Sequence, residues 1–314
     1  MNGLELTERF AEYQLDPNMG PVEVTLRIFR DMFFPPNAQQ SQQQDQQQPR
    51  LQLKVFGAGL PRSGTGSLAV ALSKLGYRPI HGAGTIELAP ILDRHYKYDK
   101  YDEDYASNLD IIDWQEDHGY DAQGLDQLGW KLYKEVADHY PDVKIILTVH
   151  PRGALAWSES FTSCIPRATY WFQKYPFKFS GSWQTLMILW EEIHGYISGG
   201  KTSEDPIFQY PGHGLANYYE QHNQRVIDYV PSDRLLVFDP SDGWEPLCEF
   251  LEIEDASCPK TPYPNMTLRN TIIVLSKVTQ AIVLIWCPGI PMLIVTIILL
   301  VAYKKKRRRK QKQQ

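Results

Sequence analysis

The stretch from Leu53 to Gly76, LKVFGAGLPRSGTGSLAVALSKLG, restricts the fold more than any other part of the chain. Its first residues, LKVF, are typical of a short buried strand, and the run Gly57–Gly66 holds too many glycines to continue as strand or helix. Apolar residues then recur at helical spacing over Ser67–Leu75, and Gly76 ends the pattern. The stretch therefore predicts a strand, a glycine loop and a helix in succession.

A loop of this composition is suited to bind a phosphate or sulfate group. Its backbone N–H groups and the first turn of the following helix converge on one point, where the helix dipole is positive. Arg62 adds a cation, and Ser63, Thr65 and Ser67 add hydroxyl donors. A strand-to-helix turn without a ligand would not need glycines, an arginine and three hydroxyls together.

Two familiar nucleotide loops fit this stretch incompletely. A Walker A loop requires GxxxxGK[ST], and Gly59 and Gly64 have that spacing, but Thr65 replaces the lysine. A dinucleotide fingerprint requires GxGxxG, and after Gly57 and Gly59 the third glycine is replaced by Arg62. For each of these two loop types, this stretch thus lacks one residue that the chemistry of that loop requires.

The string Arg62-Ser63-Gly64-Thr65 resembles the 5′-phosphosulfate loop of the P-loop sulfotransferases. The strings GAGLPRSGTGSLAVALSKLGY, GYDA, DGWEPLCEFLEI and PYPN resemble the sulfotransferase-like branch of that superfamily, in order, over residues 51–265. The resemblance implies a three-layer α/β/α, P-loop NTPase-like fold with a mainly parallel sheet. It also implies a metal-free reaction with 3′-phosphoadenosine 5′-phosphosulfate as co-substrate, bound by Arg62, Ser63, Gly64, Thr65, Gly66 and Ser67.

A second part of the donor site is expected after the predicted central strand Val143–Val149. In the resembled family this strand ends in an arginine, followed eight residues later by a serine, and the two bind the donor's 3′-phosphate. Here His150 and Ser158 stand at those positions. A neutral imidazole binds phosphate less well than a guanidinium, so Arg152 is expected to supply the charge. Ser160 is the alternative serine if the loop carries an insertion.

The catalytic residues predicted are Arg62, which would stabilise charge on the bridging oxygen, and His81, which would take the acceptor proton. His81 follows a predicted strand, Tyr77–His81, where ligands bind in open α/β sheets, although a purely structural histidine remains the alternative. Asp121 is a second candidate base. Its neighbours Asp110, Asp113 and Asp117 indicate a solvated helix face instead of a metal site.

Composition divides the chain into parts. Residues 1–38 form an N-terminal segment, and 39–50 a disordered linker, with eight glutamines in positions 39–48. Residues 51–265 form the sulfotransferase-like domain, with further helices expected at 87–92, 128–140, 183–197 and 215–230 and a last strand at 234–238. Of the four cysteines, Cys287 lies in an apolar run, and the other three (Cys164, Cys248 and Cys258) show neither metal nor disulfide spacing, which favours a reducing compartment. The start of the chain shows no signal peptide.

The end of the chain predicts membrane attachment. Positions 278–303 are 26 residues without a charge, where ~20 suffice to span a bilayer. We assign 271–303 to a single span, or to a hairpin bent at Pro288-Gly289-Ile290-Pro291, and 304–314 to a basic tail. Eight of the 32 basic residues lie in that tail, so the acidic remainder argues against nucleic-acid binding. We expect a cytosolic catalytic domain, in which the sequon at Asn265 would stay unused.

The sequence thus predicts a membrane-anchored sulfotransferase that acts on a hydroxyl or amine of a small-molecule or lipid acceptor, with acceptor and oligomeric state unspecified. One alternative is an NAD-dependent nucleotide-sugar epimerase or dehydratase, which would use the Gly57-x-Gly59 loop with Tyr96 and Lys100. The other is a membrane-tethered nucleotide-binding protein without turnover, suggested by His150 in place of arginine.

Overall fold

The computed structural model describes residues 49–81, 87–126, 128–172, 213–266, 273–274 and 276–285, together with isolated positions elsewhere. Its centre is one parallel sheet with the strand order β2-β1-β3-β4. The strands are β1 (Val55–Gly57), β2 (Ala122–Gln123), β3 (Lys144–Thr148) and β4 (Leu235–Phe238). An α/β fold with a parallel sheet is therefore confirmed.

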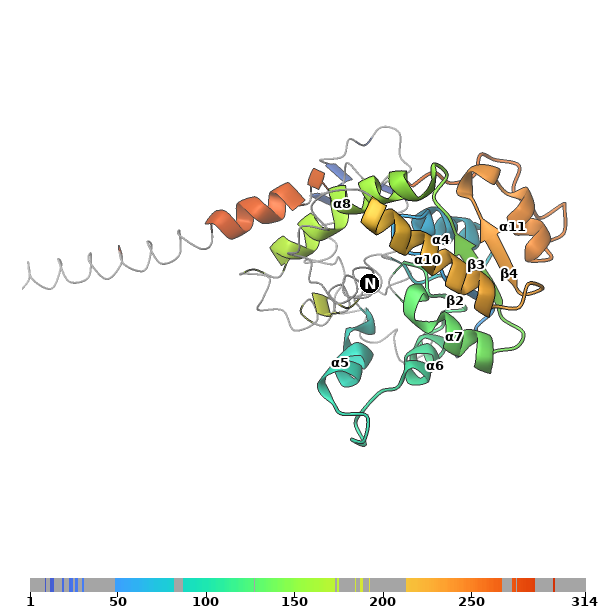
Figure 1. Ribbon diagram of the computed structural model, residues 1–314, viewed down its shortest axis with the longest axis horizontal. Coiled ribbons are helices and arrows are strands. Elements are labelled where there is room, and N and C mark those ends of the chain that lie inside the picture. Colours follow the sequence, from blue (N-terminus) through green and yellow to red (C-terminus); the bar gives the residue numbers. More distant parts are fainter. Residues whose placement is uncertain are drawn as a thin grey trace, which may run out of the picture.

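Helices cover both faces of the sheet (Figure 1). They are α4 (Thr65–Lys74), α5 (Ala89–Lys97), α6 (Asn108–Asp117), α7 (Gly129–His139), α8 (Gly153–Phe172), α10 (His213–Tyr229) and α11 (Glu245–Phe250), with a 3₁₀ turn at Pro240–Asp242. On β3, Ile145 and Leu147 face the core under α5, α6, α7, α8 and α10, whereas Ile146 faces the core under α4 and α11. This alternation places apolar side chains on both faces, as a buried parallel strand requires.

The edge of the sheet beside β2 differs from the expectation. The predicted strand Tyr77–His81 is reduced to a single bridge, from Pro79 to Ala122. On this side of the sheet, the strand that pairs with β1 is instead β2, within the GYDAQ string, whose Asp121 periodicity assigned to a helical face. That helix, α6, ends earlier, and Ser107 and Asp110 fix its start through a reciprocal capping box.

A disulfide joins Cys248 on α11 to Cys258. The expectation that the cysteines form no disulfide is therefore wrong. The two cysteines are ten positions apart, and the chain turns back after α11 so that both pack in the core beside Trp244. The expected reducing compartment loses the argument that supported it, because disulfides persist mainly in oxidising compartments.

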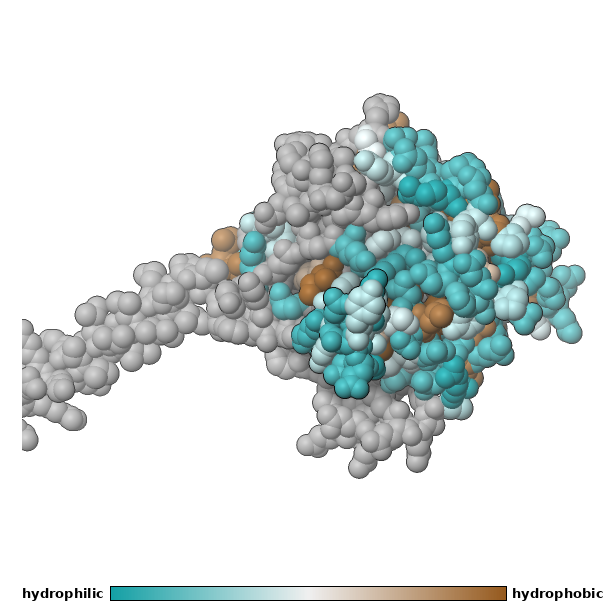
Figure 2. Space-filling model, turned by 60° about the horizontal axis from the view of Figure 1, so that its bottom comes forward, coloured by the Kyte–Doolittle hydropathy of each residue, from teal (hydrophilic) through white to brown (hydrophobic). Residues whose placement is uncertain are grey.

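The C-terminal apolar run lies mostly outside the described residues. Of positions 278–303, the structure describes 278–285 and 296, all helical. No helix among the described residues is both long enough and apolar enough to cross a membrane. The glutamine-rich tract at 39–48 and most of the predicted helix at 183–197 also lie outside the described residues. On the face shown in Figure 2, the described surface is mostly hydrophilic, with small separate apolar spots.

Candidate active site

The loop Gly57–Gly66 lies at the carboxyl edge of the sheet and runs from the last residue of β1 into the first turn of α4. Arg62 and Gly64 both have positive φ values, 73° and 107°, which turn the chain sharply before the helix. Gly64 is the N-cap residue of α4, and no side chain caps this end. The N–H groups of the first helical turn have no partner within the helix, so they are available to an anion.

Two glycines let the loop approach its neighbours closely. A Cβ atom on Gly59 would overlap the Thr148 hydroxyl at the end of β3. A Cβ atom on Gly64 would overlap the ring of Pro240, which follows β4. The loop is thus held against the ends of both neighbouring strands.

Side chains from α8 and α10 hold the loop in place by hydrogen bonds to its backbone carbonyl groups. Trp157 Nε1 donates to the Pro61 carbonyl at 2.8 Å. His222 Nε2 donates to the Ala58 carbonyl, also at 2.8 Å, and burial lowers the pKa of His222 to about 4, so the imidazole stays neutral. Both donors are buried, which preorganises the loop before any ligand arrives.

The predicted hydroxyl donors are partly engaged within the protein. Ser63 Oγ donates to the Leu60 carbonyl at 2.6 Å and lies 2.7 Å from Thr148 Oγ1, so Ser63 shapes the loop. Ser67 Oγ accepts from the backbone N–H of Met266 at 3.0 Å. The backbone N–H groups of the first turn of α4 and Arg62 are therefore the candidate anion-binding groups of the loop, together with Ser67, whose hydroxyl acts as an acceptor toward Met266.

Three of the residues predicted to bind the donor, Arg62, His150 and Arg152, lie near one another at the carboxyl edge of the sheet. Burial lowers the pKa of His150, and the charges of Arg152 and Arg62 lower it further, while Asp239 acts in the opposite direction. His150 Nδ1 accepts from the Arg152 N–H at 3.2 Å, as expected for a neutral imidazole. Arg152 itself is exposed. The charge at this position thus comes from the two arginines and not from His150.

Of the two candidate serines, Ser160 is the one that contacts the loop. Arg62 Nε donates to Ser160 Oγ at 3.2 Å. Ser158 Oγ donates to the Leu155 carbonyl of its own helix at 2.7 Å, and Ser158 is fully buried. Side chains two positions apart on an α-helix point in directions that differ by about 200°, so Ser158 and Ser160 face opposite sides of α8.

His81, the predicted base, lies over the start of α4. Its Nε2 atom is 3.4 Å from Thr65 Oγ1 and 3.8 Å from a carboxylate oxygen of Asp126. A Cβ atom on Gly66 would lie 3.2 Å from the His81 ring, so the glycine permits this approach. Asp126 was not among the predicted residues. Its sequence signal was an acid just after a short strand, hidden because GYDAQ was not recognised as a strand.

Asp121, the other predicted base, lies at the opposite edge of the sheet. It precedes β2, and its carboxylate accepts from Arg78 N at 2.6 Å and from Lys54 Nζ at 3.1 Å. These partners hold the start of the β1–β2 pair together. The prediction that Asp121 acts at the site is therefore wrong.

Comparison with known proteins assigns this arrangement to a family. Residues 54–272 match a family model described as a sulfotransferase domain. The chain belongs to the sulfotransferase domain family. A curated relative, Ava biosynthesis cluster protein M of Aspergillus versicolor, is 27% identical over 227 residues, which cover 68% of this chain and 80% of the relative. The matched region of the sulfotransferase domain contains every site residue described above.

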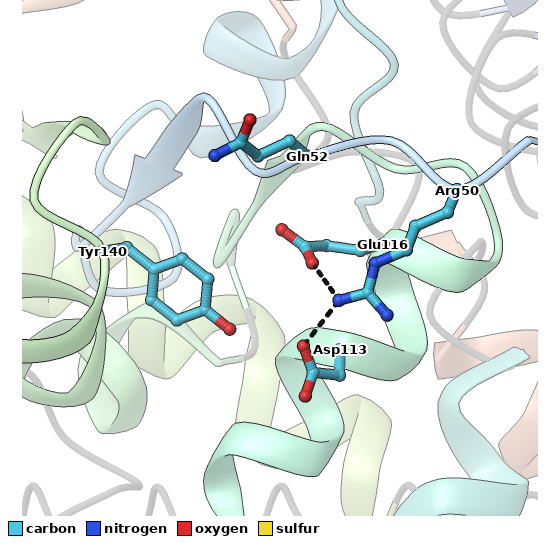
Figure 3. Close-up of a pocket in the computed structure, with 5 residues that line it drawn as sticks. All are labelled: Arg50, Gln52, Asp113, Glu116 and Tyr140. Carbon is cyan, nitrogen blue, oxygen red and sulfur yellow. Dashed lines mark hydrogen bonds and ion pairs between the residues drawn. The ribbon is translucent and has the colours of Figure 1, made fainter.

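A cavity of about 420 Å³ lies away from the glycine loop. Its lining residues are Arg50, Gln52, Asp113, Glu116 and Tyr140 (Figure 3). Arg50 Nη2 donates to Asp113 at 2.9 Å and to Glu116 at 2.7 Å. These residues precede β1 and β3 or belong to α6, so the cavity is at the amino edge, whereas ligands of open α/β sheets bind at the carboxyl edge. We interpret the cluster as a clamp that fastens the entry to β1 onto α6.

Proposed function

We propose that this sulfotransferase-domain protein transfers a sulfuryl group from 3′-phosphoadenosine 5′-phosphosulfate to a hydroxyl or amine of a small-molecule or lipid acceptor. The observation that carries the proposal is the preorganised loop Gly57–Gly66, which presents Arg62 and the uncapped start of α4 at one point, in a chain of this family. His81 lies beside that point.

The residues present fit the donor's 5′ end well. Gly59 and Gly64 keep the loop tight against β3 and Pro240, and the N–H groups of the first turn of α4 match the oxygens of a phosphosulfate group. At the 3′ end, the fit depends on Arg152 and Ser160, because His150 is neutral. We therefore propose Arg152 in place of His150 as the main cation for the 3′-phosphate.

The chain's own groups would act on the reaction in two ways. The loop N–H groups and Arg62 would stabilise the negative charge that gathers on the bridging oxygen when the S–O bond breaks. His81, whose pKa burial lowers, is neutral at pH 7 and so able to take the acceptor proton. Binding of the co-substrate supplies the sulfuryl group itself.

The first alternative function, a dinucleotide-dependent enzyme, would need Tyr96 and Lys100 as a catalytic pair, and both side chains have other contacts. The Tyr96 hydroxyl donates to Glu192, and Lys100 Nζ lies 4.9 Å from the ring centroid of Tyr101. Neither side chain is directed at the glycine loop. A nucleotide-binding protein without turnover remains the second candidate, because His150 replaces a guanidinium in the resembled motif.

We test donor binding by the thermal stability of the full chain in detergent with adenosine 3′,5′-bisphosphate, using NAD and ATP as controls. A ligand that binds only the folded state raises the stability, by about 2.7 kcal/mol at a concentration of 100 times its Kd. We expect a rise with the bisphosphate that is lost in Arg62→Ala. A rise with NAD or ATP alone would contradict the proposal, and binding without transfer to a broad acceptor panel would support the second candidate.

We also propose that the apolar run 278–303 and the basic tail attach the protein to a membrane. A hairpin bent at positions 288–291 would keep both ends cytosolic, and the basic tail would bind anionic head groups. The Cys248–Cys258 disulfide argues for an oxidising compartment instead. Asn265 is exposed, so its glycosylation in cells would overturn the cytosolic placement.

A further inference from the structure

The turn that follows β3 is shaped by hydrogen bonds to His150. The His150 N–H group donates to the Tyr219 hydroxyl at 2.7 Å, and its carbonyl accepts from the Gly153 N–H at 2.9 Å. Its Nδ1 atom accepts from the Arg152 N–H at 3.2 Å. A side chain that accepts from the N–H group two residues ahead stabilises a turn, a role that asparagine and aspartate often have. His150 therefore uses both backbone groups and one ring nitrogen to hold this turn.

These bonds give a structural reason for a histidine where the resembled family has an arginine. The exposed Arg152 lies two positions further on, and its charge and that of Arg62 both act on His150, whose pKa burial also lowers. The neutral ring cannot supply the positive charge of the turn. It instead fixes the backbone that carries Arg152.

A stack of two buried rings connects this turn to the glycine loop. Tyr219 on α10 and Trp157 on α8 are 3% and 0% exposed, and their ring centroids lie 4.6 Å apart at an interplanar angle of 27°. The Tyr219 hydroxyl holds the turn at His150. Trp157 Nε1 donates to the Pro61 carbonyl of the loop at 2.8 Å. Each ring thus anchors one part of the proposed donor site.

We propose that Trp157 and Tyr219 form a positioning pair that fixes the distance between the glycine loop and the turn at His150, and so selects a nucleotide with both a 5′ and a 3′ anion. This inference rests on the proposed function and deepens it, because it names residues that place Arg152 without contacting the ligand. Two stacked, buried rings have little freedom left to lose when a ligand binds. A displaced turn would misalign Arg152 with the 3′-phosphate, and hydrogen bonds weaken steeply with misalignment.

The test compares the Kd values of adenosine 3′,5′-bisphosphate and adenosine 5′-phosphate for the full chain in detergent, measured by calorimetry. The ratio of the two Kd values gives the contribution of the 3′-phosphate. We expect the wild type to bind the bisphosphate about tenfold more tightly, as one charge-assisted contact allows. Tyr219→Phe keeps the stacked ring but removes the hydroxyl, so the ratio should fall by about fivefold, through weaker bisphosphate binding.

The matched control is Trp157→Phe, which keeps a ring for the stack but removes the N–H donor to the Pro61 carbonyl. Both nucleotides carry the 5′ group that the loop would bind. We therefore expect this variant to weaken both by the same factor and to leave the ratio as in the wild type. An unchanged ratio in Tyr219→Phe, or an equal fall of the ratio in both variants, would overturn the inference.

Two variants of His150 decide the question even if Tyr219→Phe does not fold. His150→Asn keeps an acceptor atom in place of Nδ1 and should retain the ratio, whereas His150→Ala lacks the acceptor and should lower it. Loss in both variants would make His150 itself a phosphate ligand, and retention in both would make the turn independent of it, so either result would overturn the inference. Equal Kd values for the two nucleotides in the wild type would also overturn it. A wild-type chain that binds neither nucleotide would overturn the proposed function instead.

Discussion

At the scale of single residues, the site depends on glycines as much as on charged groups. Gly59 is the position at which the loop meets Thr148, the last residue of β3, most closely. Thr148 in turn contacts Ser63, which bonds back to Leu60. The close approach at this one small residue therefore connects the central strand to the glycine loop.

We predict that Gly59→Ala destabilises the folded chain by about 1–3 kcal/mol and weakens bisphosphate binding, because the added methyl group displaces the Thr148 hydroxyl. Urea unfolding and the ligand-induced thermal shift measure the two effects. The double variant Gly59→Ala, Thr148→Ala removes the hydroxyl and should recover part of the loss. Strict additivity of the two substitutions would contradict this explanation.

At the scale of elements, the loop is stabilised by two helices far from it in sequence. Trp157 on α8 and His222 on α10 each donate to a loop carbonyl, and α8 and α10 pack against each other. Trp157 also stacks on Tyr219 of α10, with ring centroids 4.6 Å apart. The two helices therefore act as one support for the loop.

We predict that His222 makes the fold sensitive to acid. Its folded pKa, about 4, is below the ordinary value near 6.5, so the unfolded chain binds a proton that the folded chain does not. Stability contributed by neutral His222 is complete above pH ~6.5 and falls as the pH drops toward 4, by roughly 3 kcal/mol. Urea unfolding at pH 7, 6, 5 and 4 measures this slope.

The matched variant is His222→Gln, which keeps an N–H donor for the Ala58 carbonyl but cannot titrate. We expect it to be less stable than the wild type at pH 7 and to lose less stability between pH 6.5 and 4. Equal acid slopes in the two proteins would assign the acid sensitivity to other groups.

At the scale of the whole molecule, the chain combines a strongly basic end with a mainly acidic body. The described body carries its apolar side chains inside, in one core on each face of the sheet. Of the charge-free run 278–303, the described residues Val283 and Ile282 pack against one of these cores. The membrane attachment that we propose belongs to this C-terminal end.

We predict that deletion of residues 278–314 moves the protein from the membrane fraction to the soluble fraction of cells. Replacement of the tail's lysines and arginines by glutamine should leave the protein on membranes but weaken its binding to anionic vesicles, by ~1 kcal/mol per charge near the surface. Cell fractionation and vesicle sedimentation measure these effects. Retention of the deletion variant on membranes would place the attachment elsewhere in the chain.

The sequence by itself determined the parts of this protein that are local. A strand, a glycine loop and a helix follow from spacing within 24 residues, and β3 and β4 follow from short apolar runs, because these patterns depend on neighbouring residues. The anion-binding role that we propose for Arg62 and the loop was predicted from the same stretch.

Only the tertiary structure decided which distant residues join that loop. Pairing of β2 with β1 brings Asp126 to His81 and leaves Asp121 at the opposite edge, although the two acids are five residues apart. The direction of α8 turns Ser160 toward Arg62 and Ser158 into its own helix. A parallel sheet gathers the carboxyl ends of strands that are far apart in sequence, so strand order and helix rotation, which a local pattern does not encode, select these residues.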